Sequence, residues 1–122
     1  MARADEAARG PDREGLREAL DRARADAAAR VAEFDTVARG LAAARGDADG
    51  DDEHDPEGST VAWDRAVADA AADAARRHLA DVDTARRRLD AGWDGSCAAC
   101  GRPIPAARLA VRPQTDRCVD CA

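Results

Sequence analysis

Apolar residues recur at helical spacing along two long stretches of this chain. The first stretch runs from about residue 12 to residue 45, and its apolar positions are Leu16, Leu20, Ala23, Ala27, Val31, Phe34, Ala38 and Leu41. A seven-residue repeat with intermediate positions is the pattern of two helices that pack along a seam. Gly10-Pro11-Asp12 suits the start of this helix, and Gly46 suits the residue after its end.

The second stretch runs from about residue 60 to residue 91. Its predicted apolar face consists of Trp63, Val67, Ala71, Ala74, Leu79, Val82 and Leu89. Ser59 or Thr60 can cap the start of this helix, and Gly92 suits the residue after its end. Two long helices joined by a short loop predict an antiparallel hairpin, and alanine-rich seams allow close approach of the two backbones.

The predicted fold is mostly all-α, a long helical hairpin of coiled-coil type followed by a small C-terminal module with four cysteines. We expect residues 1–10 to be a flexible tail, residues 11–92 to form the hairpin and residues 93–122 to form the module. Residues 46–59, here called the tip segment, are rich in Gly, Asp and Pro and predict the loop of the hairpin. About 30 residues at ~1.5 Å each predict a prong ~45–50 Å long, with this segment at its far end.

All four cysteines of the chain lie in two CxxC pairs with seventeen residues between them, and they are Cys97, Cys100, Cys118 and Cys121. Two such pairs complete a tetrahedral cage of four sulfurs for Zn²⁺, and this cage leaves no open coordination position. The metal is therefore expected to be structural. Fe²⁺ would use the same ligands, so this alternative stays open. A redox dithiol is disfavoured, because it needs a single CxxC at the start of a helix that follows a strand.

Charge is distributed unevenly along the chain. The net charge is −6, and residues 46–60 carry −7 without a single arginine, so the remainder is nearly neutral. A basic stripe typical of a nucleic-acid binder is absent, which argues against sequence-specific DNA binding. The sequence has no apolar stretch of ~20 residues, no apolar leader and no nucleophile set or phosphate loop. It therefore predicts a cytoplasmic protein that binds no membrane and is not an enzyme.

Residues 92–121 resemble the DksA/TraR C4-type zinc-finger family. GWDGSC at residues 92–97 is similar to that family's G-aromatic-x-G-x-C motif, and CGRPIP at 100–105 is similar to its CGxxI knuckle. RLAVRP at 108–113 is similar to its RL-x-Ala-x-Pro segment, with Val111 in place of the usual alanine. The resemblance covers about thirty residues, and the preceding hairpin matches the family's architecture.

The resemblance implies a transcription regulator that binds bacterial RNA polymerase through the secondary channel. In the family, the tip of a coiled-coil prong carries a D-x-x-D-x-A motif. Asp52 and Asp55 have this spacing and would be the effector residues, whereas Glu57 stands where the family has alanine. Asp51, Glu53 and Glu57 would be accessory to them. The chain stops at Ala122, short of the family's C-terminal helix, so we predict no guanosine tetraphosphate site.

Two other functions remain open from the sequence. A transcript-cleavage type of accessory factor would use the tip carboxylates to hold Mg²⁺ for the hydrolytic reaction of the polymerase. A zinc-stabilised interaction module would instead bind an unrelated protein. We expect the protein to be a monomer, although an alanine-rich seam is also suited to pairing with a second chain.

Overall fold

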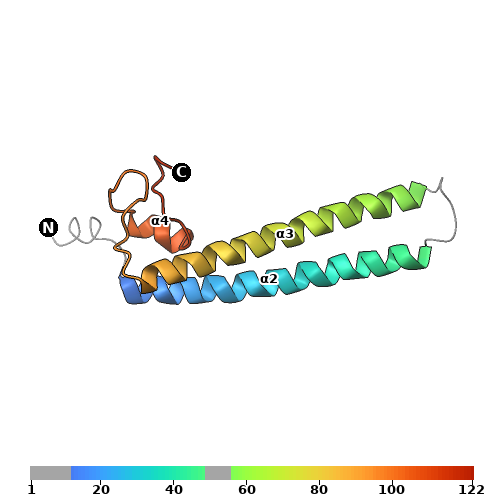
Figure 1. The fold of residues 1–122 in the computed structure, drawn as a ribbon, viewed down its shortest axis with the longest axis horizontal. Coiled ribbons are helices and arrows are strands. Elements are labelled where there is room, and N and C mark those ends of the chain that lie inside the picture. The colour runs from blue at the N-terminus through green and yellow to red at the C-terminus, as the bar shows by residue number, and fades with distance from the viewer. Residues whose placement is uncertain (1–11, 49–55) are drawn as a thin grey trace. The chain divides into compact units, whose positions relative to one another are not determined.

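The structure is a computed structural model that describes residues 12–48 and 56–122, with side chains for residues 12–43 and 60–122. Its helices are α2 (Arg13–Ala48), α3 (Pro56–Asp90) and the short α4 (Ala106–Val111), and the described residues form no strand. The chain divides into two compact units. The first unit contains the described residues up to Ala25 together with Ala80–Ala122, and the second unit is Asp26–Leu79. Within each unit, α2 and α3 run side by side in opposite directions (Figure 1).

The first long helix begins as predicted but ends later. Asp12 precedes α2, where its side chain accepts a hydrogen bond from the Glu14 N–H and its carbonyl accepts one from the Leu16 N–H. The helix continues through Gly46 to Ala48, so the prediction that Gly46 follows its end was wrong. One glycine costs a helix only about 1 kcal/mol relative to alanine, and the neighbouring residues are mostly strong helix formers.

The second long helix starts earlier than predicted. It begins at Pro56, so Ser59 and Thr60 lie inside α3 and the prediction that one of them caps it was wrong. Proline suits this place, because the first turn needs no N–H donor and the ring fixes φ near the helical value. The predicted loop, residues 46–59, is therefore too long at both ends, because α2 extends to Ala48 and α3 begins at Pro56. Its central residues, 49–55, lie outside the described part of the chain, as does the predicted tail, 1–10.

The predicted role of Gly92 just after the end of α3 is confirmed, since the helix ends at Asp90 and the chain turns away from it at Gly92. Gly92 has φ +104°, its N–H donates to the Leu89 carbonyl, and the N–H of Trp93 donates to the Arg88 carbonyl. This pair of bonds is the Schellman motif, in which glycine at the left-handed position lets the chain leave the helix with its last carbonyls satisfied. Arg13 adds a further hydrogen bond to the Leu89 carbonyl at 2.7 Å. The turn that leads into the cysteine-containing segment is therefore fixed by local backbone chemistry.

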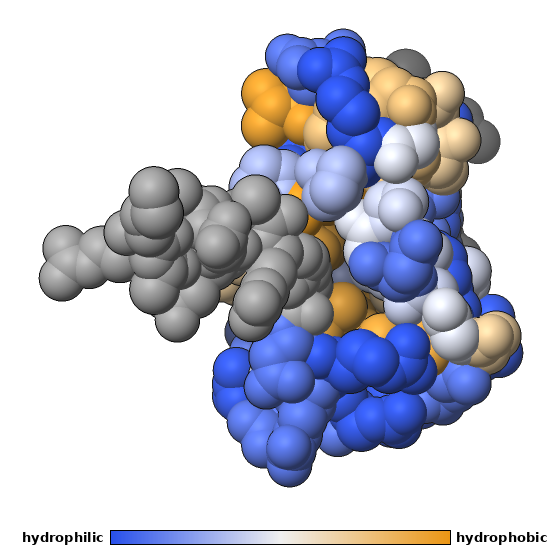
Figure 2. Space-filling model, turned by 90° about the vertical axis from the view of Figure 1, so that its left-hand side faces the viewer, coloured by the Kyte–Doolittle hydropathy of each residue, from blue (hydrophilic) through white to orange (hydrophobic). Residues whose placement is uncertain are grey.

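One core joins the helices and the cysteine-containing segment of the first unit. It consists of Leu16, Leu20, Val82, Ala85, Leu89, Cys97, Ile104, Leu109 and Cys118. Two of the four cysteines are thus buried among aliphatic side chains from both long helices. Figure 2 shows one face of the molecule, which is mostly hydrophilic with smaller apolar areas. The mostly helical fold with a C-terminal cysteine cluster is confirmed.

The seam of the second unit has a different register from the one predicted. Its buried apolar residues are alanines, namely Ala27, Ala68 and Ala72, whereas Trp63 is 70% exposed and Val67 is 52% exposed. The prediction that Trp63 and Val67 face α2 was therefore wrong. Stepping back along α3 from Leu89 by seven residues at a time leads to the buried Val82, the half-buried Ala75 and the buried Ala68. The large side chains of the first unit therefore set which face of α3 is turned inward.

Ion pairs between α2 and α3 agree with this register. In the first unit, Arg24 pairs with Asp83 at 2.7 Å and Arg86 pairs with Asp21 at 2.9 Å. In the second unit, Arg76 pairs with Asp35. Each exposed pair contributes only ~0–1 kcal/mol. None of the helices in the described part of the chain has an apolar stretch long enough to cross a bilayer.

Candidate metal centre

The first CxxC pair lies on a tight turn. The Cys97 N–H donates to the Arg102 carbonyl at 2.8 Å, and the Gly101 N–H donates to the Cys97 carbonyl at 2.9 Å. Gly101 has φ +76°, which glycine adopts without a steric penalty. These bonds bring Cys97 and Cys100 to the same side of the turn, and a β-bridge between Ser96 and Pro103 closes it.

The second CxxC pair forms a similar turn near the C-terminus. The Cys121 N–H donates to the Cys118 carbonyl at 3.1 Å. Two hydrogen bonds connect this turn to the first one: the Ala98 N–H donates to the Asp116 carbonyl at 2.8 Å, and the Cys118 N–H donates to the Cys97 sulfur at 3.4 Å. The helix α4 lies between the two turns in sequence and buries Leu109 in the shared core.

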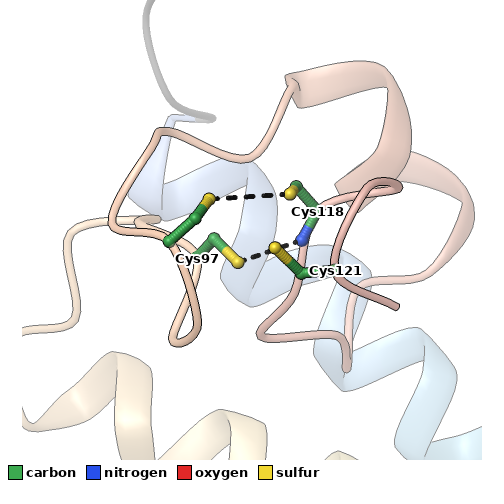
Figure 3. Close-up of side chains that lie close together, drawn as sticks. Cys97, Cys118 and Cys121 are labelled. Carbon is green, nitrogen blue, oxygen red and sulfur yellow. Dashed lines mark hydrogen bonds between the residues drawn. The ribbon is translucent and has the colours of Figure 1, made fainter.

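The four sulfurs gather into one cluster. All of them lie within 4.8 Å of one another, and the sulfurs of Cys100 and Cys118 are 3.8 Å apart. Figure 3 shows the side chains of Cys97, Cys118 and Cys121 pointing toward a common centre. A tetrahedral zinc site with Zn–S bonds of ~2.3 Å has sulfur–sulfur edges of ~3.8 Å. The donor set and its spacing therefore fit a closed, structural zinc ion.

Hydrogen bonding makes the thiols of the cluster unequal. The Cys118 N–H lowers the pKa of Cys97 to about 6, because this donor stabilises the thiolate. Hydrogen bonds with the sulfurs of Cys118 and Cys100 raise the pKa of Cys121 to about 12. A divalent cation at the centre stabilises all four thiolates, so its binding must displace the proton of Cys121.

Two side chains outside the CxxC pairs support the site, and sequence reasoning did not assign them this role. A hydrogen bond with the Cys100 sulfur raises the pKa of Arg102, so a permanent positive charge lies beside the thiolates. The Trp93 indole N–H donates to the Ser96 carbonyl at 3.0 Å, and the Arg88 guanidinium lies 4.9 Å from the centre of the indole. The sequence signal was available, since Trp93 and Arg102 lie within five residues of Cys97 or Cys100.

The structure does not test the predicted tip residues. Asp51, Asp52, Glu53 and Asp55 lie outside the described residues, and the side chain of Glu57 does as well, although its backbone belongs to α3. Their role remains a prediction. The metal centre is the only group of three or more His, Cys, Asp or Glu side chains with clustered ligand atoms in the part of the chain that the structure describes.

Comparison with known proteins agrees with the cysteine cluster and the fold. Residues 92–122 match the model of the prokaryotic dksA/traR C4-type zinc-finger family. The structure of transcription factor DksA2 from Pseudomonas aeruginosa is similar to this one, with a TM-score of 0.73 and 23% sequence identity over 89% of this chain and 78% of that chain. No curated protein matches the sequence. The resemblance and zinc as the predicted cofactor are thereby confirmed.

Proposed function

We propose that this chain, whose residues 92–122 are a zinc finger of the dksA/traR family, is a transcription regulator that binds bacterial RNA polymerase. One observation carries the proposal. Two helices of 36 and 35 residues precede the C4 finger in the chain and pack together. A protein described as a transcription factor has the same fold. A zinc finger alone would fit many partners, whereas the combination with a long hairpin is much more restrictive.

The finer mechanism follows the family resemblance. The hairpin enters the secondary channel of the polymerase and delivers the carboxylates of the tip segment toward the active centre. Asp52 and Asp55 act there by electrostatic interaction with the catalytic Mg²⁺ or with basic groups, and initiation complexes become less stable. Asp51, Glu53 and Glu57 add to the negative potential, which a low-dielectric channel strengthens.

The proposed role of zinc is structural. Zn²⁺ holds the two CxxC turns against the helix ends and supplies no chemistry to the polymerase. The regulator itself is not an enzyme, acts in the cytoplasm, binds the polymerase as a monomer and does not recognise a DNA sequence. The negative charge of residues 46–60 supports this last point, because it would repel phosphates.

A transcript-cleavage factor is the second candidate. The density of carboxylates in the tip segment favours it, since hard oxygen ligands are what a second Mg²⁺ requires. A zinc-stabilised module with a different protein partner is the third. The departure from the family motif at Glu57 keeps it open.

The test measures binding to RNA polymerase core together with transcription from a ribosomal promoter. Three proteins are compared: wild type, an Asp52→Asn/Asp55→Asn variant and an Asp47→Asn/Asp49→Asn variant that loses the same charge outside the motif. We expect all three to bind and only the Asp52/Asp55 variant to lose its effect on transcription.

The other outcomes separate the alternatives. Cleavage of backtracked RNA that needs the tip carboxylates would establish the second candidate. If both variants lose their effect on transcription equally, the total negative charge of the tip segment is responsible for it, and the D-x-x-D spacing is not. If the wild-type protein does not bind the polymerase at micromolar concentration, the proposal is wrong and the third candidate remains.

A further inference from the structure

Arg88 lies in the last turn of α3 and contacts two segments that are far apart in the sequence. Its guanidinium carbon lies 4.9 Å from the centre of the Trp93 indole, and a terminal nitrogen donates a hydrogen bond to the Gln114 carbonyl at 3.4 Å. Both contacts lie within the first unit. The π electrons of the indole attract the cation, and a guanidinium has several N–H donors, so one side chain can contact both segments.

The two contacts fall at equivalent positions in front of the cysteines. Trp93 precedes Cys97 by four residues, and Gln114 precedes Cys118 by four residues. Cys97 and Cys118 are the first cysteines of the two CxxC pairs, and both belong to the core of the first unit. Arg88 therefore contacts the chain at the same number of residues from each half of the metal centre.

In the first segment, a hydrogen bond connects the Arg88 contact with the backbone next to the first cysteine. The Trp93 indole N–H donates to the carbonyl of Ser96, the residue directly before Cys97, at 3.0 Å. Ser96 also forms the β-bridge with Pro103 that closes the first CxxC turn. An indole held against Arg88 therefore fixes the backbone from which Cys97 extends.

The second segment has the same arrangement with a different side chain. Thr115, the neighbour of Gln114, donates its hydroxyl to the Arg117 carbonyl at 3.1 Å and accepts a hydrogen bond from the Arg117 N–H at 3.2 Å. Arg117 is the residue directly before Cys118. The Arg88 contact at the Gln114 carbonyl therefore fixes the backbone from which Cys118 extends.

The burial of Arg88 is unfavourable in one respect. Its Nε atom is buried and has no hydrogen-bond partner among the residues that the structure describes. An unpaired buried donor lowers stability, so the contacts of the rest of the guanidinium must offset this loss. The neighbouring Arg87 is exposed and donates to the Thr84 hydroxyl on its own helix at 3.1 Å. Two adjacent arginines thus differ in what they contact, which makes Arg87 a matched control.

We propose that Arg88 is a positioning residue of the metal centre: by contacting Trp93 and the Gln114 carbonyl together, it holds the two CxxC turns at the separation that one metal ion requires. That separation is short, since the four sulfurs lie within 4.8 Å of one another. Groups that orient metal ligands without touching the metal typically change metal affinity by about 10–100-fold. The inference depends on the zinc site and not on binding to RNA polymerase.

Zinc affinity of the full-length protein, measured by competition with a chromophoric chelator, tests the proposal. Arg88→Met keeps the helix propensity and an apolar stem but removes both contacts. Arg87→Met removes the same charge one residue away, and Gln114→Ala leaves the main-chain carbonyl that Arg88 contacts. We expect Arg88→Met to bind zinc at least about tenfold more weakly than wild type, and both controls to bind within about twofold of it.

Two further variants distinguish positioning from a general loss of stability. Trp93→Leu removes the indole, so its effect and that of Arg88→Met should be coupled. We expect the double variant to lose at least about threefold less affinity than the product of the two single losses. Arg88→Lys keeps a cation for the indole and a donor for the carbonyl, and it should recover part of the affinity that Arg88→Met loses.

Co²⁺ adds a spectroscopic signature, because its visible absorption depends on the arrangement of its ligands. At saturating Co²⁺, we expect Arg88→Met to change the visible bands and Arg87→Met to reproduce those of wild type. Three results overturn the proposal. The first is a zinc affinity of Arg88→Met within about twofold of wild type. The other two are losses that multiply in the double variant and wild-type Co²⁺ bands in Arg88→Met, and either would mean that Arg88 only stabilises the fold.

Discussion

Loss of zinc should unfold the finger together with the parts of α2 and α3 that belong to the first unit, and should leave the second unit folded. Cys97 and Cys118 belong to the same core as Leu16, Leu20 and Leu89, so the first unit is expected to unfold when the metal is lost. Structural zinc contributes ~10–16 kcal/mol in small fingers, which is comparable to the ~5–15 kcal/mol stability of a whole domain. Roughly a third of the residues of α2 and α3 lie in the first unit and should lose their helical structure, while those of the second unit keep it.

Cys100→Ser is the suitable perturbation, because Cys100 is exposed and its substitution removes a ligand without creating a cavity. Zinc content and circular dichroism at 222 nm would be measured first. Hydrogen exchange would then identify the amides that lose protection. We expect loss for residues 80–90 and retention within residues 26–79. Ala99→Ser is the matched control, since it places a hydroxyl at the neighbouring exposed position and leaves all four sulfurs in place.

Two results would refute this reasoning. If the amides of residues 80–90 stay protected in the zinc-free variant, the core of the first unit does not depend on the metal and the finger is a separate module. If protection within residues 26–79 disappears as well, the two units unfold together and their division has no thermodynamic meaning.

Three further predictions concern the turn, the core and the thiols. Gly92→Ala should destabilise the protein by about 1–2 kcal/mol, because φ at this residue is +104°. Gly40→Ala should stabilise it by about 0.5–1 kcal/mol, because a Cβ at this helical position meets no other atom. Urea denaturation of both variants distinguishes the two effects. Leu89→Ala should cost about 2–5 kcal/mol and Val111→Ala close to nothing, as thermal denaturation would show, and equal effects would contradict the assignment of the core. Zinc affinity should rise with pH between about 6 and 8, by up to about tenfold per pH unit for each proton displaced. The reason is that the Cys121 thiol, with its pKa of about 12, must lose a proton when zinc binds. Competition with a chromophoric chelator measures the affinity, and an affinity that does not change with pH would contradict the prediction.

Helix existence and the cysteine cluster were predictable because both depend on local spacing. The seven-residue repeat of α2 identified Leu16, Leu20 and Ala27 as inward-facing, and all three are buried. Helix ends were less predictable. Gly46 lies inside α2 and Pro56 begins α3, because each terminus depends on a balance of small propensities that the neighbouring residues can shift.

The sequence by itself determined the two helices, the zinc ligands and the glycine that follows α3, since helical periodicity, each CxxC pair and the turn at Gly92 all depend on residues a few positions apart in the chain. Only the tertiary structure decided which face of α3 turns inward. An alanine-rich helix tolerates more than one register, and the choice rests on contacts of Leu89 and Val82 with residues more than sixty positions away. The same long-range packing left Trp63 at the surface and placed Cys97 and Cys118 in one core with the helix ends, because neither the exposure of a side chain nor a shared core is a property of local sequence.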